Sequence, residues 1–249
     1  KINKKNSMKT LIIIPSRLSA TRLPNKPLLK INGLSIISHV FKKAESTNIG
    51  EVVVAAEDQE IIDDVKSNGG QAILTSREPK TGTDRIFEAL TKLNRSDVDF
   101  IMNIQGDEPG IDIEDIKNLN KQMKTHQAKI GTLAARILNP KMYDDENVVK
   151  VLTNENFKKN SFPLAETFTR KIETKNNIFH HIGIYCYEIE TLKKFVSYKQ
   201  SKNEIANRLE QLRALDNNIK INVALAKSSP IGVDTKEDYL AIKKIMEYK

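Results

Sequence analysis

The sequence predicts an α/β protein with a mostly parallel β-sheet and a smaller α+β lobe inserted in its second half. Two patterns indicate this fold. Short apolar runs rich in β-branched residues alternate with amphipathic helical segments up to about residue 130, and the alternation then becomes irregular. Strands and helices that alternate at this spacing form parallel sheets with right-handed crossovers. The chain of 249 residues is long enough for one large domain of this kind.

The first half of the chain contains four expected strands and four expected helices. Apolar runs predict strands at residues 11–14, 51–56, 72–74 and 98–104, and Pro15 is expected to end the first of them. Helical spacing of apolar residues predicts a helix at 35–47, a second after a cap at Asp58, a third after a cap at Thr83 and a fourth that begins at Asp112.

The second half is less regular. Strands are expected at residues 130–138, 147–153, 178–187 and 219–226, and helices at 202–215 and 235–248. Residues 154–177 are polar and carry no clear periodicity. We therefore expect a single domain over residues 8–249, with a lobe at 139–215 and a short extension or tag remnant at 1–7 ahead of Met8.

Composition excludes several classes of protein. No apolar run approaches the roughly 18 residues that span a bilayer, and residues 1–10 are too polar for a signal peptide. The net charge of +8 falls to +5 once Lys1, Lys4 and Lys5 are left out, and tryptophan is absent, so a stacking platform for nucleic acid is not expected. The lone Cys186 excludes an intrachain disulfide, and a cytoplasmic protein with a buried, inert thiol is the simplest expectation.

A loop at residues 16–28 follows the first predicted strand and is rich in cations and hydroxyls: Arg17, Arg22, Lys26, Ser16, Ser19 and Thr21. Open α/β sheets bind ligands at the carboxyl ends of their strands. Because charge-assisted hydrogen bonds to phosphate are strong, this loop favours a triphosphate ligand. It lacks the Walker and G-x-G-x-x-G patterns. An ordinary solvated basic loop is the alternative interpretation.

Asp107 is a candidate metal ligand, and Asp234 is a second carboxylate without a required structural role. Asp107 directly follows the strand predicted at 98–104, and Mg²⁺ binds one or two carboxylates together with substrate oxygens. Alternatively, Asp107 forms an Asx-turn ahead of Pro109. Asp234 precedes Thr235, which can cap the last helix together with Asp238. Capping does not require Asp234, so this carboxylate is available for another role.

The sequence resembles the sugar-activating nucleotidyltransferases, and among them the CMP-Kdo synthetase (3-deoxy-manno-octulosonate cytidylyltransferase) family. The motifs that carry the resemblance are IIPSR at 13–17, TRLPNKPL at 21–28, TGTDR at 81–85, QGDEP at 105–109, HIGIY at 181–185, LEQLR at 209–213 and VDTKED at 233–238. They extend over nearly the whole chain. Ser16 replaces the usual alanine and Asn25 the usual glycine; asparagine tolerates the left-handed conformation better than most residues.

The resemblance implies a Rossmann-like sheet of the nucleotide-diphospho-sugar transferase type. It implies a Mg²⁺-dependent transferase that activates Kdo with CTP, releases pyrophosphate and serves bacterial lipopolysaccharide synthesis. It also implies a cytoplasmic homodimer, with the lobe at 139–215 supplying the sugar site and a subunit contact. No nucleic-acid or membrane partner is expected.

The resemblance further implies roles for individual residues. It assigns catalysis to Arg17, Lys26 and Asp107, and metal binding to Asp107 and Asp234. The residues that it assigns to nucleotide binding are Pro15, Ser16, Arg17, Arg22, Lys26, Gly82, Thr83, Arg85 and Gln105. The residues that it assigns to sugar binding are Gln105, Arg170, His181, Tyr185, Glu210 and Gln211. By residue type alone, His181 would more often be structural, and Glu210 would form a surface pair with Arg213.

Three alternatives stay open at this point. A CMP-sialic acid synthetase shares the first loop, although HIGIY, LEQLR and QGDEP together favour Kdo. A cytidylyltransferase for a close Kdo variant, such as its 8-amino analogue, differs only in a few pocket atoms. A basic nucleic-acid-binding module belongs to a different class, and its binding would fall steeply with salt.

Overall fold

The computed structural model describes residues 8–248, so the expectation about residues 1–7 lies outside the described residues. The chain forms two compact units. We call Lys9–Lys117 with Pro230–Lys249 the terminal unit, and Asn118–Ser229 the inserted unit. The lobe predicted at 139–215 lies within the inserted unit.

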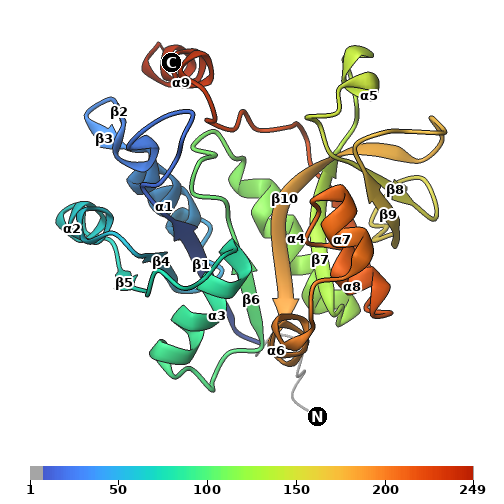
Figure 1. Cartoon of the computed structure of the whole chain (residues 1–249), viewed down its shortest axis with the longest axis horizontal. Coiled ribbons are helices and arrows are strands. Elements are labelled where there is room, and N and C mark those ends of the chain that lie inside the picture. The colour runs from blue at the N-terminus through green and yellow to red at the C-terminus, as the bar shows by residue number, and fades with distance from the viewer. Residues whose placement is uncertain (1–7, 249) are drawn as a thin grey trace. The chain divides into compact units, whose positions relative to one another are not determined.

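The terminal unit is built on four parallel strands in the order β6-β1-β4-β5. These are β1 (Thr10–Ser16), β4 (Val52–Ala56), β5 (Ala72–Leu74) and β6 (Phe100–Asn103), and Figure 1 shows β1 next to β4. Residues 11–14 of β1 are fully buried, as expected for a strand covered on both faces. The prediction that Pro15 ends this strand is wrong, because β1 continues to Ser16. Pairing with β6 stops at Ile13, so Pro15 lies where β1 has a ladder partner only on its β4 side, and a proline is tolerated there.

Helices of the terminal unit mostly follow the predictions: α1 (Ile36–Ser46), α2 (Gln59–Ser67), α3 (Gly82–Leu93) and α9 (Lys236–Glu247). Thr235 and Asp238 form the expected capping box of α9. The predicted cap of α3 is wrong by two residues, since Thr81, not Thr83, accepts the backbone N–H of Asp84. A short 3₁₀ helix η2 (Lys26–Leu28) and the hairpin of β2 (Lys30–Ile31) and β3 (Leu34–Ser35) follow the first loop.

The inserted unit has a mixed sheet in the order β11-β7-β10-β8-β9. Its strands are β7 (Ile130–Ala135), β8 (Lys150–Thr153), β9 (Ala165–Thr169), β10 (Ile178–Glu188) and β11 (Ile221–Leu225). Only β7 and β11 pair in parallel. Strand β9, α5 (Lys141–Asp144) and α6 (Ile189–Ser197) were not predicted. The chain enters this unit within α4 (Ile113–His126), and Cys186 on β10 is fully buried, with its thiol pKa raised by burial.

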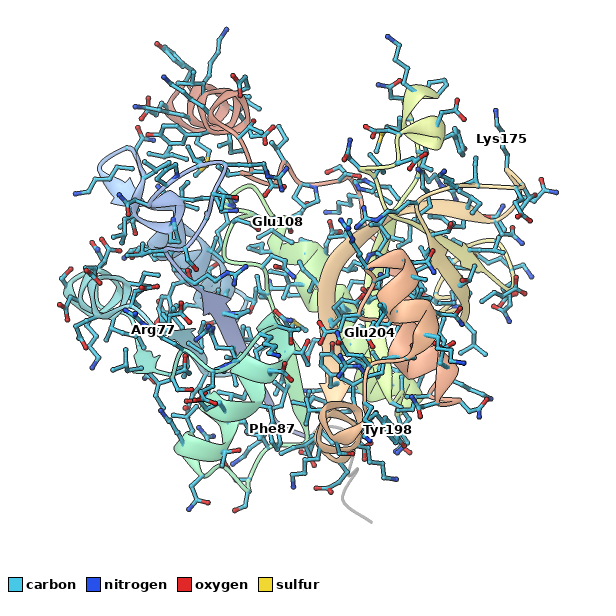
Figure 2. All side chains as sticks on the ribbon, viewed as in Figure 1. Arg77, Phe87, Glu108, Lys175, Tyr198 and Glu204 are labelled. Atoms are coloured by element: carbon cyan, nitrogen blue, oxygen red, sulfur yellow. The ribbon has the colours of Figure 1, made fainter. Side chains whose placement is uncertain are left out.

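The helix predicted at 202–215 is two helices, α7 (Lys202–Asn207) and α8 (Leu212–Asp216). Arg208 ends α7 in the left-handed conformation, with φ of 53°, and Ile205, expected to face inward, is 60% exposed. The interruption is stabilised by Glu204, whose carboxylate accepts two hydrogen bonds from the Arg213 guanidinium, at 2.8 and 2.6 Å. Both side chains are buried (Glu204 is labelled in Figure 2). Arg213 therefore forms a buried ion pair with Glu204.

No helix within residues 8–248 is both long and apolar enough to cross a bilayer.

Replacing Glu204 with alanine would leave the Arg213 guanidinium buried without its carboxylate. Removing one partner of a buried ion pair costs about 3–5 kcal/mol, and we expect the free energy of unfolding in urea to fall by that amount. Glu190→Ala is the matched control, because its pair with Lys193 lies on the surface and should change stability by less than about 1 kcal/mol. Equal effects of the two variants would contradict this account of the α7–α8 break.

Candidate active site

A cavity of about 460 Å³ opens in the terminal unit, in the size range of small-molecule sites. It lies at the carboxyl ends of parallel strands, where the loops after β1 and β6 and the start of α3 converge. Its lining includes every residue predicted to bind the nucleotide except Thr83, which is buried in α3: Pro15, Ser16, Arg17, Arg22, Lys26, Gly82, Arg85 and Gln105. Both predicted metal ligands, Asp107 and Asp234, line it as well.

The first loop is held in place by backbone conformation and by one side chain that the sequence did not single out. Asn25 adopts the left-handed conformation, with φ of 56°, which asparagine tolerates better than most residues. Pro27 is buried in the 3₁₀ helix that follows. Asp58 does not cap α2 with its side chain; its carboxylate instead accepts the backbone N–H of Leu18, at 2.8 Å. The loop that carries the cations is thus anchored near both of its ends.

Gly106 allows the loop after β6 to approach β1 closely. A Cβ atom at this position would lie 3.1 Å from the backbone oxygen of Pro15 and 3.1 Å from Cδ1 of Ile37. The backbone oxygen is the harder of the two neighbours to move. The glycine of QGDEP therefore serves the packing that brings Gln105 and Asp107 to the cavity.

Asp107 and Asp234 converge on one cation. Lys26 Nζ donates to Asp107 Oδ2 at 2.9 Å and to Asp234 Oδ1 at 3.4 Å. The backbone also joins the two loops, since the N–H of buried Val233 donates to the carbonyl of Asp107 at 2.9 Å. The two carboxylates therefore contact the same Lys26 ammonium group from two different loops.

This arrangement fits the predicted magnesium ion. No group of three or more histidine, cysteine or acidic side chains within residues 8–248 is placed to bind a metal. Asp107 and Asp234, however, hold the Lys26 ammonium group between them. Two such carboxylates are a suitable donor set for Mg²⁺, which takes its remaining ligands from phosphate and water.

Glu108 is a third carboxyl group at this end of the sheet, and sequence reasoning passed over it. Its Oε2 is buried and has no hydrogen-bond partner in the described part of the chain (the residue is labelled in Figure 2). Burial, followed by the charges of Asp107 and Asp234, raises the pKa of Glu108 to about 8. This carboxyl group is therefore mostly protonated at neutral pH, so it adds little negative charge to the cavity.

Arg85 lines the cavity, but its guanidinium is bound to protein groups. It donates to Glu57 Oε2 at 2.5 Å, to Thr75 Oγ1 at 2.5 Å and to the carbonyl of Ser76 at 3.0 Å, and the residue is buried. These bonds connect the end of β4 to the loop that precedes α3. Arg85 therefore fixes that loop at the edge of the cavity through these bonds. Glu57, its ionic partner, carried no motif in the sequence.

His181 and Tyr185 lie on β10 in the inserted unit, on either side of an irregularity in its pairing with β7. The register shifts between Ile182 and Tyr185, so the glycine of HIGIY lies at an irregularity of the β10–β7 pairing. Irregularities of this kind turn side chains to new directions. The motif thus has a geometric role that its letters alone did not reveal.

The polar atoms of this cluster are arranged around Thr132 of β7. Thr132 Oγ1 lies 3.0 Å from His181 Nε2 and donates to the carbonyl of Ile184 at 2.6 Å, which makes Nε2–H of His181 the donor to Thr132. Burial, and secondarily His180, lowers the pKa of His181 to about 3, so this ring is neutral at physiological pH. The Tyr185 hydroxyl is buried without a hydrogen-bond partner among residues 8–248, and burial raises its pKa.

The remaining predicted sugar residues also lie in the inserted unit. Glu210 and Gln211 occupy the link between α7 and α8 and are half-buried. Arg170 follows β9, and its Nη1 donates to the carbonyl of Glu146 at 3.1 Å. Its own carbonyl accepts from Lys150 Nζ at 2.8 Å. Lys150 is fully buried and was not predicted as a site residue; it also donates to the carbonyl of Asp145, so it fixes the backbone on which Arg170 sits.

Gly106→Ala should disturb the cavity directly. The added methyl group must displace the Pro15 carbonyl or Ile37, and overpacking of this kind costs about 1–3 kcal/mol. We expect a lower midpoint of urea unfolding. Gly232→Ala is the control on the facing loop, because its Cβ atom would meet only Glu108 Cγ at 3.9 Å. If both variants behaved like the unmodified protein, close approach at Gly106 would not matter.

Comparisons with known proteins agree with this architecture. A family model described as Cytidylyltransferase matches residues 11–221. The 3-deoxy-manno-octulosonate cytidylyltransferase of Thermodesulfovibrio yellowstonii is 41% identical over 96% of this chain and 98% of the relative. That of Bartonella tribocorum is 37% identical over 96% of this chain and 99% of the relative.

Solved structures give the same assignment. A CMP:2-keto-3-deoxy-manno-octonic acid synthetase complexed with CTP superposes with a TM-score of 0.88 at 32% identity, over 96% of this chain and 99% of that one. A UDP-glucose pyrophosphorylase, at 13% identity and a TM-score of 0.71 over 96% of this chain and 98% of that one, shares the fold alone. The predicted fold class is confirmed, and the chain belongs to the 3-deoxy-manno-octulosonate cytidylyltransferase family.

Proposed function

We propose that this protein transfers the cytidylyl group of CTP to Kdo, forming CMP-Kdo and pyrophosphate. The observation that carries the proposal is the cavity at the ends of β1 and β6, where three cations and two carboxylates of the family's motifs meet. The full-length relatives named for this reaction support the choice of substrates. We further propose that the protein acts as a cytoplasmic homodimer that supplies CMP-Kdo for lipopolysaccharide synthesis.

The anomeric hydroxyl of Kdo would attack the α-phosphorus of CTP in line with the leaving pyrophosphate. Phosphoryl-type transfer of this kind depends on positioning and on neutralisation of charge. Arg17 and Lys26 would contact the triphosphate and stabilise the departing pyrophosphate, and Arg22 would add a third cation at the exposed edge. Gln105, which lies just after β6 and lines the cavity, would contact the substrates.

Asp107 and Asp234 would hold Mg²⁺. When bound, the ion would neutralise phosphate charge and lower the pKa of the attacking hydroxyl. The hydrogen bond from Val233 to the Asp107 carbonyl keeps the two carboxylates together, and the capping box of α9 fixes the loop that carries Asp234.

Sugar recognition would fall to the inserted unit. The unpaired Tyr185 hydroxyl and the neutral ring of His181 provide hydrogen-bonding groups, and Glu210 and Gln211 provide a carboxylate and an amide. Arg170 would meet the sugar carboxylate, since a guanidinium fork suits that group. The buried Lys150 would keep Arg170 in place through its backbone.

The test is release of pyrophosphate from each of the four NTPs, with and without Kdo and Mg²⁺. The proposal expects release only with CTP, Kdo and Mg²⁺ together. Equal release with UTP would contradict the cytidylyl assignment, and a preference for sialic acid or for 8-amino-Kdo over Kdo would change the acceptor.

Asp107→Ala and Asp234→Ala should each remove most of the activity while the fold is retained, because each removes one of the two carboxylates assigned to Mg²⁺. Turnover should be measured over a Mg²⁺ titration, with circular dichroism to check folding. Asp63→Ala, at an exposed position on α2, is the control. Near-normal turnover of both cavity variants with unchanged Mg²⁺ dependence would show that the metal assignment is wrong.

Glu210→Ala should separate the two substrates. Without Glu210, hydroxyls of the bound sugar would be left unpaired, which costs about 1–3 kcal/mol for a buried group. KM for Kdo should therefore rise about tenfold or more, since ~1.4 kcal/mol is one decade. KM for CTP should barely change, because the nucleotide residues lie in the other unit. Steady-state kinetics with each substrate varied in turn, and Glu190→Ala as control, test this. An equal rise in KM for both substrates would contradict the assignment of Glu210 to sugar binding alone.

A further inference from the structure

Lys26 lies where a metal ion is expected. Its ammonium contacts Asp107 and Asp234, the two carboxylates to which the proposed function assigns Mg²⁺, at 2.9 and 3.4 Å. We infer that in the nucleotide-free protein Lys26 is a built-in counter-cation, and that a divalent cation binds between the two carboxylates only by displacing its ammonium. This inference rests on the metal assignment in the proposed function.

The carboxylate pair does not depend on Lys26 for its position. Val233 N–H donates to the Asp107 carbonyl, and the backbone N–H of Asp234 donates to Asp238 Oδ2 at 3.1 Å. The α9 segment that follows is packed by buried apolar residues, including Val233 and Ile242. The backbone thus holds two negative charges near each other, and such charges repel unless a cation lies between them. Lys26 supplies that cation.

Other cations of the cavity do not share this position. Arg22 reaches only Asp234, at 3.9 Å, and its side chain is 72% exposed, whereas that of Lys26 is 15% exposed. Lys80 lines the same cavity and, within the described residues, forms no ion pair with either carboxylate. The effect is therefore specific to one side chain, which makes a charge-matched control possible.

The lysine can leave without any change in the backbone. Its attachment is fixed by the left-handed Asn25 and the buried Pro27, but its ammonium sits at the end of a flexible four-carbon chain. The oxygens of a triphosphate offer this ammonium strong alternative partners in the same cavity. When Lys26 moves to them, the carboxylates become available, so nucleotide and metal binding support each other.

The test is binding of Mn²⁺, measured from the electron paramagnetic resonance signal of the free ion, with no nucleotide present. Lys26→Met should bind Mn²⁺ about tenfold more tightly than the unmodified protein, the equivalent of one charge-assisted hydrogen bond that no longer has to be broken. Lys26→Gln should fall between the two, and it carries the test if the methionine variant does not fold. Lys80→Met, which removes the same charge from the same cavity, should stay within about twofold, because its charge is screened by water.

Asp107→Asn and Asp234→Asn distinguish failure of this inference from failure of the proposed function. If they abolish Mn²⁺ binding while Lys26→Met leaves the affinity unchanged, or raises it no more than Lys80→Met does, the metal site stands and the counter-cation role is refuted. If they leave Mn²⁺ binding unchanged in every background, the metal assignment is wrong, and the inference about Lys26 is overturned with it.

Discussion

The burial of the central residues of β1 is the constraint on which the cavity depends. Residues 11–14 are fully buried between β4 and β6, so the strand direction and register are fixed by packing on both faces. The loop that carries Arg17, Arg22 and Lys26 must then leave the sheet at the same edge as the loop that carries Asp107. Opposite charges from distant parts of the chain are brought together because two parallel strands end side by side.

Buried polar groups mark the places where this protein departs from a purely structural core. Arg85 with Glu57, and Arg213 with Glu204, form buried ion pairs, and each pair connects separate segments of the chain. Glu108 and Tyr185 each keep a buried oxygen without a partner within residues 8–248. An unsatisfied buried oxygen costs stability, so such atoms in a stable protein call for a ligand, a water molecule or a catalytic reason.

The sequence predicted the terminal unit well, because buried parallel strands and amphipathic helices produce strong periodicity. It also predicted which residues line the cavity, since the motifs follow strand ends. The predictions from sequence were wrong where the tertiary contact of one side chain overrides the local helical pattern. Residues 202–215 have a helical pattern, yet the contact of Glu204 with Arg213 ends α7 early, and Asp58 bonds the first loop instead of capping α2. Partners such as Glu57 and Lys150 carry no signal, because their roles exist only once distant segments meet.

The way the chain is divided has a consequence for how such enzymes diversify. All the residues that line the cavity belong to the terminal unit, and the residues predicted for the acid sugar after Gln105 belong to the inserted unit, which the chain enters within α4 and leaves after Ser229. On the proposed division of roles, most mutations that alter the choice of acceptor would fall in one continuous segment of the gene. The residues proposed to bind the nucleotide would be inherited unchanged on either side of that segment, so a lineage could acquire a new activated sugar while keeping the same transfer reaction.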